Sequence, residues 1–159
     1  MRRRRSIERT EPSVTHPLGQ YVSIVLDKSA VASAYVDFMT GRGERLFEFL
    51  DDDFFDNISQ QRGPEIWRTV GDWLRGTFSD ISVDLHSVAQ DDDDRVLVWI
   101  TLHGTHIGSS FPFMGGCPAT GNRVAWPQVH VFRLAEDRIV EHWAVRNDLR
   151  VLEAIDQPR

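Results

Sequence analysis

The last third of the chain alternates apolar and polar residues on either side of a short polar turn. In "VHVFRLAEDRIVEHWAVR", residues 129–146, this period of two is typical of half-buried β-strands, and the "AEDR" turn makes the two strands antiparallel neighbours. Residues 81–90 and 95–108 show similar patterning on either side of the acidic run 91–94, which we interpret as a solvated hairpin turn. The second half of the chain therefore predicts a sheet, and another structural layer has to cover its apolar face.

The first half of the chain supplies that layer as helices. Apolar residues recur at helical spacing over residues 29–39, the "GRG" at 41–43 ends that helix, and residues 44–50 predict a short second one. A third helix begins at Pro64, and residues 148–155 predict a short helix near the end of the chain. The expected inward positions are Val31, Ala34, Tyr35 and Phe38 in the first helix, Leu46, Phe47 and Leu50 in the second, and Trp67, Val70, Trp73 or Leu74, and Phe78 in the third.

This order of elements predicts an α+β fold in which helices pack on one face of a curved antiparallel sheet. We expect Phe54 and Phe55 to lie in a polar turn region, and residues 109–122, rich in glycine and proline, to form a loop. Pro127 within a strand predicts a bulge or a sheet edge. Residues 21–159 then form a single domain, preceded by a mobile basic tail over residues 1–20.

Composition narrows the class of protein. The net charge of −6 over 159 residues disfavours nucleic-acid binding, which needs a basic surface. Cys117 is the single cysteine, so no intrachain disulfide is possible, and this fits a reducing, cytoplasmic location. No apolar run is long enough to span a membrane. The start "MRRRRSIERTEPSV" is basic but lacks the apolar stretch of a signal peptide, so we expect a solvated terminus, or else a basic arm that contacts an acidic partner.

One face of the two last strands is a candidate site. Parity places Gln128, His130 and Phe132 on one side of the first strand. It places Val140, His142, Ala144, Arg146 and Asp148 on one side of the second, opposite Ile139, Glu141, Trp143 and Val145. Leu102, Gly104 and His106 of the preceding strand could complete this wall. A face that mixes apolar walls with a few polar groups is typical of a small-molecule pocket.

Proton transfer is the chemistry that this set of residues supports. Histidine titrates near neutral pH, so His130 could take and return a proton. Gln128 could donate a hydrogen bond to a substrate oxygen as negative charge develops on it. Asp148 could orient Arg146 or His142, or act as a base itself. The alternative, left open by spacing alone, is that these histidines are satisfied structural side chains.

A metal site is the less favoured interpretation of the same histidines. His103, His106, His130 and His142 could in principle form an all-histidine site. His103 and His106 have opposite parity on one strand, so both can face one ion only if the chain kinks at Gly104. We therefore expect neither a metal nor a cofactor.

The remaining aromatic residues predict a cavity wall and an interface. We expect Phe38, Trp67 and Trp73 to wall a ligand cavity together with His130, with His142 and Arg146 also contacting substrate. The opposite sheet face is too apolar to remain in water, so we expect a second copy of the chain to cover it in a two-fold dimer, or else the chain's own terminal segments. That face carries Trp99, Val129, Val131, Ile139, Trp143 and Val145.

Three motifs resemble the SnoaL-like polyketide cyclase family of the nuclear-transport-factor-2-like superfamily. They are "GTHIG", "FMGGCPATGN" and "VHVFRLAEDRIVEHWAVRNDL", and the resemblance covers roughly residues 25 to 155. It implies a conical α+β barrel with one deep apolar cavity, and dimers that form through the outer sheet face. It also implies ring closure of aromatic polyketides by intramolecular aldol condensation without a metal or cofactor, with Gln128 and His130 matching the family's glutamine and histidine.

One departure from the family pattern concerns the acid–base group. The family's acid–base aspartate follows "HW", where this sequence has Ala144, and a methyl group cannot move a proton. We therefore expect a cofactor-independent cyclase-type enzyme in which His130 is the acid–base group, Gln128 the oxyanion donor, and Asp148 and His106 supporting groups. The alternatives are a non-catalytic small-molecule-binding or accessory protein, or a hydroxylation-assisting or epoxide-opening relative on the same fold.

Overall fold

A computed structural model describes residues 26–156 of the chain. The expected basic tail over residues 1–20 lies outside this range, so it stays a prediction. In chain order the elements are α1 (Lys28–Met39), α2 (Leu46–Phe49), β1 (Leu50–Asp56), β2 (Gln61–Arg62), α3 (Glu65–Thr77), β3 (Phe78–Gln90), β4 (Arg95–His106), the 3-10 turn η1 (Pro112–Met114), β5 (Arg123–Ala135), β6 (Arg138–Arg146) and α4 (Asp148–Ile155). No helix within the described range is long and apolar enough to cross a membrane.

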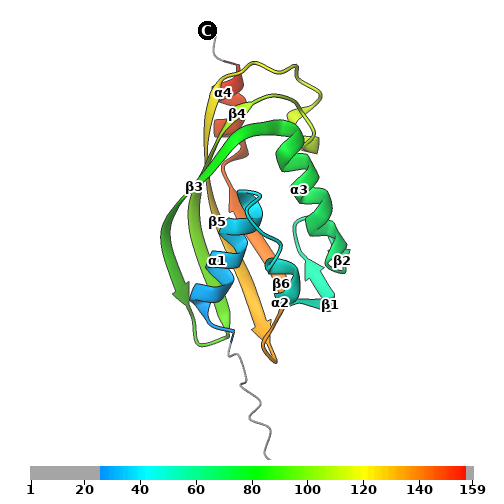
Figure 1. The fold of residues 1–159 in the computed structure, drawn as a ribbon, viewed down its shortest axis with the longest axis vertical. Coiled ribbons are helices and arrows are strands. Elements are labelled where there is room, and N and C mark those ends of the chain that lie inside the picture. The colour runs from blue at the N-terminus through cyan, green and yellow to red at the C-terminus, as the bar shows by residue number, and fades with distance from the viewer. Residues whose placement is uncertain (1–25, 157–159) are drawn as a thin grey trace, which may run out of the picture.

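The predicted α+β class is confirmed, with a curved sheet of six strands that does not close into a complete barrel. The strand order is β2-β1-β6-β5-β4-β3, and α1 and α3 lie on the same side of this sheet (Figure 1). The expected all-antiparallel sheet is wrong in one pair, because β1 runs parallel to β6. The Asp27 carboxylate caps α1 by accepting a hydrogen bond from the Ala30 N–H at 2.8 Å.

The expected polar turn around Phe54 and Phe55 is wrong, because these residues belong to strand β1. Phe55 lies opposite Glu141 of β6 and Asp56 lies opposite His142. Three aspartates in a row disfavour a strand, but Phe54 is fully buried in the core, and pairing with β6 outweighs the weak local preference. This correction matters because β1 ends at the candidate site.

The assignment of Ile139 to the outer sheet face is also wrong. The β5–β6 ladder shifts register between Arg133 and Leu134, so the inward and outward positions change places beyond that point. Ile139 is therefore fully buried in the core, whereas Trp143 and Val145 lie on the outer face as predicted. The turn itself is a two-residue hairpin in which Glu136 and Asp137 both have positive φ angles.

Pro127 lies in β5, an interior strand, so the expected edge or bulge at this position is wrong. The ladder between β4 and β5 runs without a shift, and Pro127 pairs with Thr101. The Pro127 carbonyl accepts from the Asn147 N–H at 3.1 Å, beyond the last residue of β6. The missing N–H of Pro127 therefore lies at the end of the β5–β6 ladder and interrupts neither ladder in its interior.

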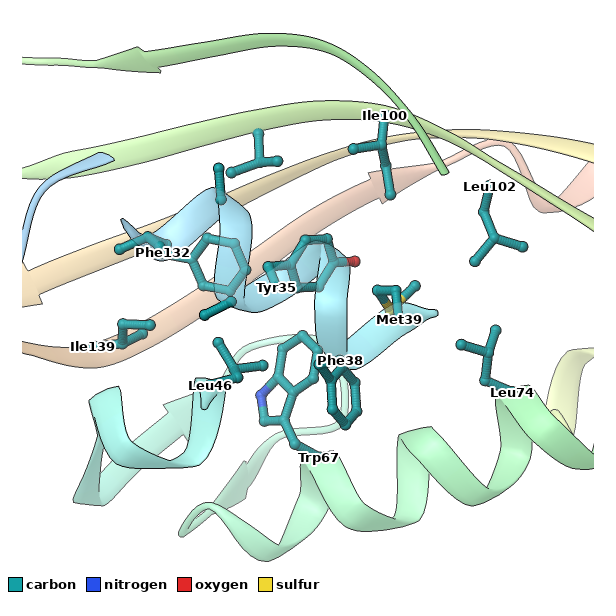
Figure 2. Close-up of a cluster of buried hydrophobic side chains, with 14 of the residues drawn as sticks. Tyr35, Phe38, Met39, Leu46, Trp67, Leu74, Ile100, Leu102, Phe132 and Ile139 are labelled. Atoms are coloured by element: carbon teal, nitrogen blue, oxygen red, sulfur yellow. The ribbon is translucent and has the colours of Figure 1, made fainter. Parts of the chain in front are cut away.

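Side chains from the helices and the concave sheet face form one continuous core. Tyr35 and Phe38 from α1 and Trp67 from α3 meet Phe132 of β5 in this core (Figure 2). At the other end of the sheet, Gly104 allows close packing, since an added Cβ would lie 2.8 Å from the Phe78 Cβ. Bulges in β3 after Ser79 and after Leu85 help the sheet to curve around the helices.

Candidate functional site

A cavity of about 290 Å³ lies between α1, α3, the η1 loop and the concave face of β5 and β6. Its walls are mostly aromatic and aliphatic, with a smaller number of polar side chains, as in small-molecule sites. The apolar lining comprises Met39, Ile58, Ile66, Trp67, Val70, Trp73, Phe111, Pro112, Phe113, Trp126 and Ala144. The polar lining comprises Tyr35, Asp56, Ser59, Gln128, His130, His142 and Arg146.

Four of these polar side chains form a continuous chain of hydrogen bonds. The Tyr35 hydroxyl lies 2.7 Å from His130 Nε2, and His130 Nδ1 lies 2.9 Å from His142 Nε2. His142 Nδ1 in turn lies 2.6 Å from Oδ1 of Asp56. The chain crosses from α1 through β5 and β6 to the end of β1, and the two imidazole rings are stacked with a 13° angle between their planes.

Asp56 is held at the end of β1 by hydrogen bonds to both of its oxygens. While Oδ1 contacts His142, Oδ2 accepts from the Ser59 N–H at 2.8 Å and from the Ser59 hydroxyl at 2.6 Å. Burial by itself would raise the pKa of this carboxyl, but the hydrogen bonds from His142 and Ser59 outweigh it and lower the pKa below 3.8. Asp56 is therefore a buried carboxylate that stays ionised at neutral pH.

Gln128 brings an amide group into the same cavity. Its Oε1 lies 2.7 Å from His130 Nε2, and its side chain is only 2 % exposed. Its Nε2 atom is buried and has no hydrogen-bond partner among the described residues. A buried donor without a partner is costly, so this amide is well suited to a ligand oxygen.

Burial dominates the electrostatics of the two histidines. It lowers the pKa of His130 well below 6.5, and the neighbouring His142 and Arg146 lower it further. Burial also lowers the pKa of His142, although the Asp56 carboxylate opposes that shift. Burial raises the pKa of Tyr35 well above 10.0, so its hydroxyl stays protonated. At neutral pH His130 and His142 are therefore both uncharged, and they can accept a proton, as a general base must.

Arg146 and Asp148 form a second polar group at the edge of the cavity. Arg146 donates to Asp148 at 3.1 Å, and its guanidinium lies over the Trp126 ring at 5.3 Å. The second Asp148 oxygen accepts from Trp126 Nε1 at 3.1 Å. Of the roles considered for Asp148, only the orientation of Arg146 is supported by a contact. Asp148 does not line the cavity, and its side-chain hydrogen bonds go to Trp126 and Arg146 and not to His142.

Three of the predicted site residues do not line the cavity, namely Asp148 at its edge and two residues that lie elsewhere. Phe38 packs between Phe47 and Trp67 in the core and does not line the cavity. His106 is buried at the far end of β4, where its Nδ1 accepts from the Thr120 N–H at 3.2 Å. The remaining predicted site residues, Trp67, Trp73, Gln128, His130, His142 and Arg146, come together around the cavity.

The four histidines considered as metal ligands do not converge. His103 lies on the outer face beside Asp84, His106 is bound to Thr120, and only His130 and His142 contact each other. Within residues 26–156, no group of three or more His, Cys, Asp or Glu side chains could hold a metal ion.

Sequence analysis missed three polar residues of the cavity lining, Tyr35, Asp56 and Ser59. Tyr35 was identified only as a core position, and Asp56 lay in a segment interpreted as a turn. Phe54 and Asp56 have the same parity and are both buried, so a strand interpretation of that segment would have pointed Asp56 inward. No local pattern distinguishes Tyr35 from its apolar neighbours on the helix.

An α+β domain whose curved sheet wraps an apolar cavity with buried, hydrogen-bonded histidines defines a class of protein built to hold a small molecule. Residues 29–155 match the family model of the SnoaL-like polyketide cyclases, and the chain belongs to that family. The family inferred from the sequence motifs is thus confirmed.

Individual relatives agree with this assignment. The chain is 29% identical over 98 residues to an aklanonic acid methyl ester cyclase of Streptomyces sp. (strain C5), a match over 61% of this chain and 58% of the relative. It is 26% identical over 109 residues to the nogalonic acid methyl ester cyclase of Streptomyces nogalater, over 66% and 78% of the two chains. The match thus spans less than two thirds of the first of these relatives.

Solved structures show the same architecture. A crystal structure of a candidate SnoaL-like polyketide cyclase from Jannaschia sp. CCS1 has a TM-score of 0.67 and 27% identity, covering 89% of this chain and 100% of the other. The structure of AclR, a candidate hydroxylase from Streptomyces galilaeus, has a TM-score of 0.66 and 24% identity, covering 82% and 97%. The second likeness is one of fold alone.

Proposed function

We propose that this protein is a cofactor-independent cyclase-type enzyme that acts on a bulky, polyketide-like small molecule by acid–base chemistry. His130 is the acid–base group, and the Gln128 amide is the donor to the developing oxyanion. One observation carries the proposal: His130 and the unpartnered Nε2 of Gln128 line the same aromatic cavity. Family membership and the methyl ester cyclases among the relatives support the substrate class.

The proposed reaction is an intramolecular aldol addition. His130 removes a proton from a carbon next to a substrate carbonyl, and the electron pair of that C–H bond remains as an enolate. The enolate carbon attacks a second carbonyl of the same molecule, and the resulting alkoxide takes the proton back. Gln128 Nε2–H donates to the oxygen on which negative charge develops, and the surrounding apolar walls strengthen that hydrogen bond.

A substitution at His130 tests this assignment. His130→Gln should retain the fold and lower turnover by about two to four powers of ten, the usual range for losing general acid–base catalysis. Aklanonic acid methyl ester and nogalonic acid methyl ester are the first substrates to assay, because two relatives are named as cyclases of these esters. His103→Gln, on the outer sheet face, is the matched control and should leave turnover unchanged.

The second candidate function is a non-catalytic small-molecule-binding or accessory protein. Ala144 favours this second function. It lines the cavity at the position of the family's acid–base aspartate, and its methyl group cannot give a proton. One experiment distinguishes the cyclase from the binding function. If the wild-type protein binds these esters, as followed by tryptophan fluorescence, and converts neither of them, the binding function is the correct one.

We also propose that two copies of the chain form a dimer through the outer sheet face, in a cytoplasmic setting. Three large apolar side chains on this face support the dimer, since Trp99 is 52% exposed, Trp143 36% and Val145 78%. Light scattering at micromolar concentration should give twice the monomer mass for the wild type. Trp143→Lys should shift that mass toward the monomer, and a monomeric wild type would exclude the dimer.

A further inference from the structure

The hydrogen-bond chain from Asp56 to Tyr35 has a direction that follows from the chemistry of its ends. An ionised carboxylate can only accept, so the 2.6 Å contact to Asp56 places a proton on Nδ1 of His142. In neutral His142, Nε2 is then an acceptor, and the 2.9 Å contact places a proton on Nδ1 of His130. Nε2 of His130, the nitrogen beside Gln128 and Tyr35, is therefore left without a proton and is the basic atom.

The two partners of this nitrogen suit its two protonation states. The Tyr35 hydroxyl, 2.7 Å away, can donate to Nε2 while it carries no proton. The Gln128 carbonyl oxygen, also 2.7 Å away, can only accept, so it suits Nε2 after a proton has arrived. While Nε2 carries no proton, this oxygen and Nε2 are two acceptors in contact, so the Gln128 carbonyl favours the protonated state of His130.

We propose that His130, His142 and Asp56 form a proton relay. His130 is the end of the relay that takes the substrate's proton, and Asp56 and His142 are positioning residues. This inference rests on the proposed function. When His130 Nε2 takes the substrate's C–H proton, the electron pair stays on the substrate as an enolate. The Nδ1 proton of His130 moves to Nε2 of His142, and the positive charge rests on His142 beside the Asp56 carboxylate. The transfers reverse when the alkoxide formed by ring closure takes the proton back from His130 Nε2.

Burial explains why a relay is advantageous here. A positive charge confined to His130 would lie in an apolar site and beside Arg146, two effects that lower its pKa. The same charge on His142 lies against an ionised carboxylate that is only 5 % exposed and is held by Ser59. The relay therefore moves the charge to the one carboxylate in the cavity lining.

The relay also accounts for the departure at Ala144. The family resemblance implies an acid–base aspartate on β6 at this position, directly opposite His130 in the β5–β6 ladder. In this chain the carboxylate comes instead from the end of β1 and reaches His130 through His142. A carboxylate thus remains linked by hydrogen bonds to the acid–base histidine.

Proton positions on the histidines test the relay independently of turnover. Long-range ¹⁵N–¹H NMR of the wild-type protein at pH 8 distinguishes the two neutral tautomers of each histidine. We expect His142 and His130 both to carry their proton on Nδ1, with His130→Gln used to assign the signals. A proton on Nε2 of neutral His142 would overturn the relay.

Substitution of Asp56 tests its contribution to catalysis. Asp56→Asn should lower kcat by about one to two powers of ten with little change in KM, as loss of a carboxylate behind a histidine does elsewhere. Asp52→Asn makes the same chemical change at an exposed position of β1 and should leave kcat unchanged. If His130→Gln abolishes turnover and Asp56→Asn does not reduce it, the relay is wrong and the proposed function stands. If neither change reduces turnover, the proposed function itself fails.

Discussion

Ala144→Asp would place a carboxylate beside His130, and the strand register allows its effect to be estimated. Ala144 lies directly opposite His130 in the β5–β6 ladder, and both residues line the cavity. The Cβ atoms of such opposite residues are about 5 Å apart, so the new negative charge would act on the imidazole at about that distance.

The expected change is a rise in the pKa of His130. Two unit charges about 5 Å apart interact by about 3 kcal/mol at an effective dielectric constant of about 20, which corresponds to roughly two pKa units. Arg146, on the same face of β6, competes for the carboxylate, so we expect a rise of about one to two units. This rise opposes the lowering of the His130 pKa by burial. A pKa closer to neutral makes His130 a stronger base, so turnover should increase.

An NMR titration of the histidine ring protons measures this change. Ala144→Asn has nearly the same shape without the charge and is the matched control. The pKa of His130 should be higher in the Asp variant than in the Asn variant. An equal or lower pKa in the Asp variant would show that the two side chains do not interact as the register requires.

Two further predictions concern stability. Acidification from pH 7 to about 5 should lower the free energy of unfolding, because His130 and His142 have lowered pKa values in the fold while the unfolded chain takes up protons near 6.5. The slope approaches about 1.4 kcal/mol per pH unit for each histidine, and urea titrations of the wild type and His130→Gln should show a shallower slope for the variant. The lowered pKa of Asp56 adds a further loss below about pH 3.8, and a flat profile would contradict these assignments. Gly104→Ala should destabilise the fold by about 1–3 kcal/mol in thermal or urea unfolding, because its Cβ would meet the Phe78 Cβ and the Ser79 carbonyl; unchanged stability would show that β3 moves aside freely.

Local patterns in the sequence predict most of the architecture. Side chains that must leave water set the period-two alternation of β4, β5 and β6 and the helical spacing of α1 and α3. This requirement can be recognised from neighbouring residues alone. For the same reason, parity placed Gln128 with His130 on one face of β5, whereas His142 of β6 joins that face through the register shift between Arg133 and Leu134. Two of the three family motifs overlap these strands, whereas "FMGGCPATGN" lies in the segment that precedes β5.

Tertiary structure alone decided the rest, since it depends on partners distant in the sequence. "DDDFFD" is a poor strand by local preference, and it forms β1 because β6 offers a free edge and Phe54 fills the core. The shift after Arg133, which turns Ile139 inward, is a property of two strands paired together and not of either one. Asp56 and Tyr35 reach His142 and His130 across 86 and 95 residues of chain, and only the folded core brings these four side chains within hydrogen-bonding distance.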